Sequence, residues 1–159
     1  MKPELYNKWL YARSFGPLEN TFGKREFMWF SQIRCYGSNN SYGKYLHKFK
    51  PTSPLKLIPL HTLEQRINLV EDIMKDHKHG NNINYKVAQI AIDPNNQYSG
   101  GNANKRLHKL LKQLYSLQYD GTIIADACAD ETCAGPTEVV VWNLHKIRYV
   151  PDSRKMCPS

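Results

Sequence analysis

The stretch Asp120–Asn143 constrains the fold of this chain more than any other, because it contains two apolar segments separated by a polar loop. Gly121–Ala125 and Val139–Trp142 are short runs rich in β-branched residues, which is typical of buried strands. Because proline is tolerated at the start of a strand but not in its middle, Pro136 favours a strand that begins directly after it. The loop holds two cysteines, three carboxylates and a turn pair: Cys128, Cys133, Asp126, Asp130, Glu131 and Gly135-Pro136.

Glu138 places a carboxylate at the start of the second of these apolar strands. Burying a charged group costs free energy unless a partner or a ligand compensates for it. The position therefore predicts a functional carboxylate. The alternative is a glutamate at the strand edge that is paired with a lysine or an arginine.

Composition limits the partners of the chain. The 159 residues carry a formal net charge of +8, which favours nucleic acid, phosphate-bearing cofactors or an acidic protein surface. The length predicts one domain over residues 1–159, with a polar tail over 152–159. No apolar run is long enough to span a bilayer, and the N-terminal residues lack the apolar core of a signal peptide. We therefore expect no membrane partner and an intracellular location, in the cytoplasm or nucleus of a host cell or in a virion.

The cysteines do not predict a metal site. They contain no C-x-x-C pair, and they form no set with the scattered histidines at the spacing of zinc ligands. We therefore expect reduced thiols at all four cysteines: Cys35, Cys128, Cys133 and Cys157.

Further apolar segments predict the remaining strands. These are Trp9–Arg13, Phe27–Ser31, a hairpin formed by Phe49 and Leu55–Leu60 around Lys50–Pro54, and a closing strand over Ile147–Val150. Lys86–Ile92 is predicted as either a strand or a helix.

Three segments predict helices. Ser41 would cap a short helix over Tyr42–Lys48. Thr62 and Gln65 match a capping box, and the helix that follows would end near Gly80. Its apolar face would consist of residues spaced by three or four: Leu63, Ile67, Val70 and Met74.

The third helix begins at Asn102 or Asn104 and is amphipathic. Its basic side is a solvated face or, alternatively, a surface that faces phosphates. Five leucines line one side and four cations line the other: Leu107, Leu110, Leu111, Leu114 and Leu117, against Lys105, Arg106, Lys109 and Lys112.

Several short segments are similar, in their order along the chain and in their residue types, to the core strands of a known fold. Leu10–Arg13 ends in a cation, Phe30-Ser31 precedes the tyrosine-bearing segment Tyr42–Tyr45, and Thr137–Asn143 carries Glu138. Together with Pro54–Ile58 and Tyr119–Gly121, they resemble the core of the ADP-ribosyltransferase fold family in its arginine–serine–glutamate form. The resemblance implies an α/β (α+β) domain whose mixed or antiparallel β core consists of two facing sheets with flanking helices.

The resemblance also implies that the chain binds and cleaves NAD. Breaking the bond between nicotinamide and ribose creates positive charge on the ribose, and Glu138 would stabilise that charge and hold a ribose hydroxyl. Arg13 would bind the pyrophosphate through its planar set of donors, and Ser31 would orient the nicotinamide ribose. One tyrosine of three would pack on a ring of the cofactor: Tyr36, Tyr42 or Tyr45.

The acceptor of the ADP-ribose stays open, either a protein or a nucleic acid. Pro136 stands where arginine-modifying members carry Glu or Gln, so the resemblance does not imply arginine as the acceptor. Two further readings remain. One is a catalytically inactive protein of this fold that acts as a structural or interaction module, for instance in a viral particle. The other is a basic nucleic-acid-binding protein that uses the Lys105–Lys112 face and the Tyr36–Lys50 segment.

Overall fold

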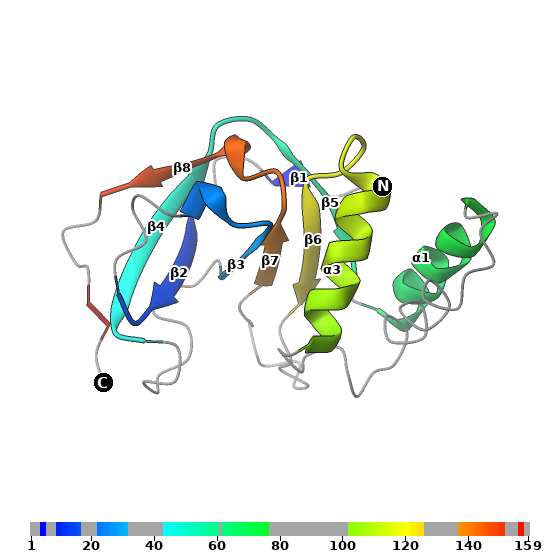
Figure 1. The fold of residues 1–159 in the computed structure, drawn as a ribbon, viewed down its shortest axis with the longest axis horizontal. Coiled ribbons are helices and arrows are strands. Elements are labelled where there is room, and N and C mark those ends of the chain that lie inside the picture. Colours follow the sequence, from blue (N-terminus) through cyan, green and yellow to red (C-terminus); the bar gives the residue numbers. More distant parts are fainter. Residues whose placement is uncertain are drawn as a thin grey trace.

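The computed structural model of the chain describes residues 4–5, 9–16, 22–31, 43–60, 62–76, 102–125, 137–151 and 156–157. These residues form an α+β fold in which two helices flank a mixed sheet (Figure 1). The helices are α1 (Leu63–Asp76) and α3 (Asn102–Tyr115), and two short 3-10 turns are η1 (Phe22–Lys24) and η3 (Leu144–Lys146). The strands are β1 (Glu4–Leu5), β2 (Leu10–Ser14), β3 (Met28–Ser31), β4 (Tyr45–Pro51), β5 (Leu55–Pro59), β6 (Gly121–Ala125), β7 (Thr137–Val141) and β8 (Ile147–Val150).

The strands lie in the order β1-β5-β6-β7-β3-β2-β4-β8. Seven of them, β2 to β8, form the body of the sheet, and the two-residue β1 pairs with the β5 edge. The pair β5–β6 is parallel, and the other neighbours are antiparallel. The described residues contain no second sheet facing the first, so the expectation of two facing sheets is not met.

A short pairing between β2 and β3, called the joint below, makes the sheet continuous. These strands share one registered pair, Tyr11 opposite Ser31, whereas β2–β4 and β6–β7 share five pairs each. The joint connects the part built from β2, β4 and β8 to the part built from β3, β7, β6 and β5. In Figure 1, β2, β4 and β8 stand to the left of β3, and β7, β6 and β5 stand to its right.

The two faces of the sheet have separate cores. Successive side chains of a strand alternate between the two faces. One face carries an apolar cluster that includes Leu10, Phe30, Phe49, Val139 and Ile147. The other face packs against the helices, where α1 and α3 contribute Leu69, Ile73, Leu107, Leu111 and others to a cluster that also includes Ile58 and Trp142.

Most predicted strands are confirmed, with ends shifted by one or two residues. The helix expected over Tyr42–Lys48 is wrong, because Tyr45–Pro51 is strand β4. It lies between β2 and β8 and pairs with both, so pairing with distant strands overrides the local preference. The expected hairpin is also wrong, since β4 and β5 have different partners. The segments 86–92 and 126–136 lie outside the described residues.

Helix α1 begins as predicted but buries a different side. Thr62 Oγ1 accepts a hydrogen bond from the Gln65 N–H, and the Thr62 N–H donates to Gln65 Oε1, both at 3.1 Å, which is the reciprocal geometry of a capping box. The expected apolar face is wrong, because Ile67 and Met74 are 40% and 48% exposed. The buried stripe consists of Arg66, Leu69 and Ile73.

Helix α3 confirms the predicted amphipathic pattern. Leu107, Leu110 and Leu111 are buried, and Lys105, Arg106 and Lys109 are exposed. Lys112 differs from these cations, because its Nζ donates to the Glu26 carbonyl at 2.9 Å. Leu117 lies beyond the end of the helix and is fully exposed. Neither helix in the described part of the chain has the length and apolar character needed to cross a membrane.

The chain returns to the sheet near its C-terminal end. Met156 forms an isolated bridge with Tyr45, and the Cys157 N–H donates to the Lys44 carbonyl at 2.9 Å.

Cys157 is buried and disulfide-bonded, so the expectation of reduced thiols is wrong for this residue. The other three cysteines lie outside the described residues. Disulfides persist mainly in oxidising compartments, so this bond does not favour the intracellular location, which stays a prediction.

The disulfide predicts how many thiols the purified protein contains. With Cys157 oxidised, the denatured and unreduced chain is expected to react with at most two equivalents of a thiol reagent, and the reduced chain with four. Reduction is also expected to lower the free energy of unfolding by about 2–4 kcal/mol, because a cross-link restricts the unfolded chain. Mass spectrometry after alkylation measures the first effect and urea unfolding the second. Four reactive thiols before reduction would contradict the assignment.

Candidate functional site

The register of the sheet aligns Glu138 and Ser31 across neighbouring strands. Ser31 on β3 lies directly opposite Glu138 on β7 and also opposite Tyr11 on β2. Directly opposite residues of antiparallel strands point to the same face, with Cβ atoms about 4.5–5.5 Å apart. Glu138, Ser31 and Tyr11 therefore form one row across the sheet. All three side chains are partly exposed, and the carboxylate and the hydroxyl face the same space.

Arg13 lies on the same face of β2, outside this row. It lies two residues after Tyr11 on the strand, and strand alternation places both side chains on the same face. Its Nε donates to the Gly43 carbonyl at 2.9 Å, which fixes the guanidinium beside the start of β4. Gly43 has φ of 93°, and a Cβ there would overlap the Ser14 carbonyl, so glycine is required at this contact.

The three tyrosines do not join the row within the described residues. Tyr45 is opposite Ser14 on β2, one residue away from Arg13. Strand alternation therefore places Tyr45 on the face opposite to Arg13, where its side chain is 39% exposed. Tyr36 and Tyr42 lie outside the described residues, as do the loop carboxylates between β6 and β7.

Helix α3 borders the row on the side of Trp29. In the next row of the same face, Trp29 and Thr122 both flank Val140 on β7. His108 of α3 is fully buried there, with Nε2 at 2.7 Å from Thr122 Oγ1 and its ring 5.8 Å from that of Trp29. The helix therefore covers the neighbouring row and stops short of Glu138 and Ser31, which stay partly exposed.

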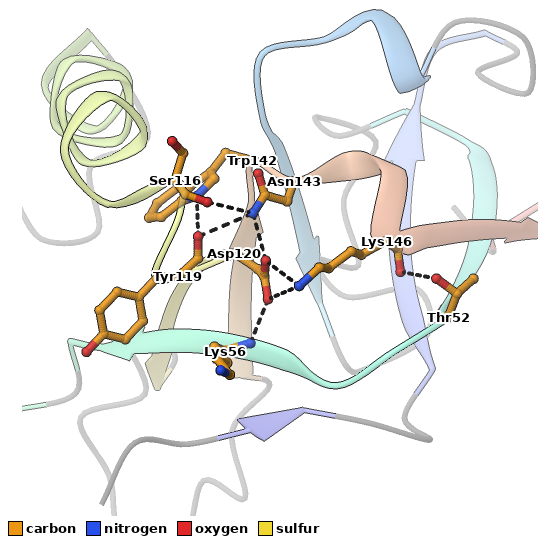
Figure 2. A network of polar contacts seen from close by, with 8 residues as sticks. All are labelled: Thr52, Lys56, Ser116, Tyr119, Asp120, Trp142, Asn143 and Lys146. Atoms are coloured by element: carbon orange, nitrogen blue, oxygen red, sulfur yellow. Dashed lines mark hydrogen bonds and ion pairs between the residues drawn. The ribbon is translucent and has the colours of Figure 1, made fainter.

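Asp120 fixes the far end of β7. Its carboxylate accepts hydrogen bonds from the Lys56 backbone N–H at 2.9 Å and from Asn143 Nδ2 at 2.7 Å (Figure 2). Lys146 Nζ lies 3.0 and 3.2 Å from the two carboxylate oxygens. The Asp120 carbonyl accepts from the Trp142 N–H at 2.9 Å. One carboxylate thus ties β5, β6, the end of β7 and η3 together.

The same turn receives further support from the end of α3. Trp142 Nε1 donates to the Tyr119 carbonyl at 2.7 Å, and Asn143 Nδ2 donates to the Ser116 carbonyl at 3.1 Å. Because β7 is held at both flanks and at its C-terminal end, the position of Glu138 near its other end is fixed by the sheet. The sequence alone predicted no role for Asp120. The sequence signal was a charged residue directly before a buried strand, the same signal that identified Glu138.

Asp120 is a structural anion rather than a candidate acid or base. Burial acts to raise the pKa of its carboxyl group, but the Asn143 amide, the Lys56 N–H and the Lys146 ammonium oppose burial and lower the pKa below its usual value. The group therefore stays ionised at neutral pH. A lowered pKa also keeps it from exchanging protons during a reaction near pH 7.

The structure describes a cavity of about 200 Å³ away from this row, between α1, β5 and the end of α3. Its lining includes Pro59, Asn68, Asp72, Tyr115 and Tyr119, and none of Arg13, Ser31 and Glu138. No group of three or more metal-ligating side chains occurs among the described residues.

Comparison of the chain with protein-family models, with curated proteins and with solved structures gives no match. The feature that bears on function is the arrangement of Arg13, Ser31 and Glu138 on three adjacent strands.

Proposed function

We propose that the chain is a NAD-dependent ADP-ribosyltransferase that transfers ADP-ribose to a protein or nucleic-acid acceptor. The observation that supports the proposal is the shared face of Arg13, Ser31 and Glu138. These residues are distant in sequence, yet β2, β3 and β7 are neighbours, and the register puts the serine directly opposite the glutamate. A cation, a hydroxyl and a carboxylate on one sheet face match the charge pattern of NAD at its pyrophosphate and nicotinamide ribose.

The proposed reaction breaks the bond between the anomeric carbon of the ribose and the nicotinamide nitrogen. Nicotinamide leaves with the bonding electron pair, and the ribose becomes cationic. A nucleophile of the acceptor then bonds to the same carbon and releases its proton to the surrounding water. Glu138 lowers the barrier because its negative charge stabilises the cationic ribose of the transition state more strongly than the ground state, in which the positive charge lies on the nicotinamide ring.

Arg13 and Ser31 position the substrate in this proposal. The guanidinium offers several N–H donors in one plane, which suits a pyrophosphate, and the Gly43 carbonyl holds its Nε in place. The Ser31 hydroxyl lies beside Glu138 and orients the ribose next to the carboxylate.

Two measurements on the wild-type protein test the proposal. Incubation with NAD labelled in the adenosine moiety, with and without a cell lysate, is expected to release nicotinamide and to label a macromolecule in the lysate. NAD at about a hundred times its dissociation constant is expected to stabilise the fold by about 2.7 kcal/mol, which raises the melting temperature by several degrees. If nicotinamide is not released and the melting temperature does not shift, the chain is instead an inactive structural or interaction module.

A further inference from the structure

The face that carries Arg13, Ser31 and Glu138 continues onto β4 and β8 as a basic and aromatic surface. Tyr11, opposite Ser31, is also opposite Lys48 of β4. Lys50 lies two residues further along β4 and is opposite Arg148 of β8. We call the group Trp9, Tyr11, Lys48, Lys50 and Arg148 the basic face.

The basic face gathers like charges on strands that carry no acidic residue. Strands β2, β4 and β8 contain no Asp or Glu, and within the described residues no carboxylate forms an ion pair with Lys48, Lys50 or Arg148. Like charges directly opposite each other on a sheet are destabilising, and Lys50 and Arg148 are such a pair. A bound anion would remove this repulsion, so the surface is suited to a polyanion.

Trp9 is held at the surface by two of these cations. Lys48 Nζ lies 3.7 Å from the centre of its ring and Lys50 Nζ lies 4.9 Å away, both within the range of cation–π attraction. The ring is still 38% exposed, although a large aromatic side chain usually gains from burial. Tyr11, two residues further along the chain on β2, is also partly exposed. The basic face therefore combines flat rings with cations that form no ion pair within the described residues.

We propose that the basic face binds single-stranded nucleic acid. Single strands expose both phosphates and the flat faces of bases, and aromatic rings interleaved with cations bind both without reading the sequence. A duplex hides its base faces, while an acidic peptide or an anionic lipid surface offers charge without a series of bases to stack on Trp9 and Tyr11.

The bound strand would pass the candidate site. Glu138, Ser31, Tyr11 and Lys48 occupy one row across β7, β3, β2 and β4, so a strand on the basic face lies along the same surface as the carboxylate. The bound nucleic acid would also be the acceptor of ADP-ribose, and this part of the inference rests on the proposed function. Binding itself needs no NAD and is tested without it.

The experiment measures fluorescence anisotropy of a labelled 12-nucleotide single strand of mixed sequence, in DNA and RNA form, at several salt concentrations. The triple variant Lys48→Gln, Lys50→Gln and Arg148→Gln is expected to bind at least about tenfold more weakly than wild type. Its plot of log affinity against log salt should be shallower by about 2, because each phosphate contact to a single strand contributes about 0.7. Trp9→Leu is expected to weaken binding at least about fivefold with an unchanged slope.

The matched control removes the same charge elsewhere. The variant Lys105→Gln, Arg106→Gln and Lys109→Gln takes three exposed cations from α3 and is expected to retain the affinity of wild type. Equal losses in both triple variants would overturn the proposal in favour of a diffuse charge effect. Tighter binding of polyglutamate, of a duplex of the same length or of anionic vesicles would also overturn it.

Nicotinamide release is measured on the same samples. Oligonucleotide binding without NAD cleavage would remove the proposed enzymatic function and leave the basic face as a nucleic-acid site. Cleavage without oligonucleotide binding would remove the basic face and leave the enzyme.

Discussion

Glu138→Gln is expected to lower the rate of nicotinamide release from NAD by about 10²–10³-fold, which is the effect of removing one group that stabilises charge in a transition state. Glutamine has nearly the same shape as glutamate but no net charge. It therefore retains contact with the ribose hydroxyl and loses the attraction to the cationic ribose. NAD affinity, measured by thermal shift, should change little, because the charge on the ribose develops only as the bond breaks.

Two variants make this result specific. Glu71→Gln removes an exposed carboxylate from α1 and is expected to leave NAD cleavage unchanged. Glu138→Asp keeps the charge but shortens the side chain, so its activity should fall between those of wild type and Glu138→Gln. Turnover at the wild-type rate in Glu138→Gln, with an unchanged melting temperature, would remove Glu138 from the mechanism.

Asp120→Ala is expected to lower the free energy of unfolding at pH 7 by about 3 kcal/mol. The side chain of Asp120 is 4% exposed, and its loss leaves three donors without their acceptor. The lower end of the range for a broken buried ion pair applies, because the Lys146 side chain is 32% exposed and can reach water. Urea unfolding monitored by tryptophan fluorescence measures the effect.

The same carboxylate gives the stability of the protein a dependence on pH. Because the folded protein lowers the pKa of Asp120 below its ordinary value of 3.8, the unfolded chain takes up this proton first as the pH falls. The stabilisation is therefore fully present above about pH 5 and is lost as the pH falls through the folded-state pKa. The difference in unfolding free energy between wild type and Asp120→Asn should shrink between pH 5 and pH 2.

Asp72→Ala serves as the control for both measurements. Asp72 is exposed on α1, and its replacement is expected to change the free energy of unfolding by less than about 0.5 kcal/mol. An equal loss of stability in Asp72→Ala and Asp120→Ala would show that the Asp120 network does not hold the sheet together.

Local pattern was sufficient to predict several elements. The β-branched runs of β6 and β7, the closing strand β8, and the amphipathic leucine repeat of α3 can all be read from neighbouring residues, because strand and helix periodicities repeat within a few positions. The same holds for the Thr62–Gln65 capping box, whose two hydrogen bonds span three residues.

The errors fall where distant contacts decide. The segment Tyr45–Pro51 became a strand because β2 and β8 lie on its two sides, and neither neighbour is visible in the local sequence. The buried side of α1 is set by the cluster that it joins, so Ile67 and Met74 face solvent while Arg66 is buried. The disulfide at Cys157 likewise depends on a second cysteine elsewhere in the chain.

The sequence by itself determined which side chains of this protein can carry chemistry: a carboxylate at a strand mouth, a serine and an arginine at strand ends, and an excess of positive charge. Only the tertiary structure decided that they share a face. Residues 13, 31 and 138 come to one face through the register of three strands, and register is set by pairing between segments that are far apart in the chain. A shift of one residue in that pairing would turn Glu138 into the apolar core.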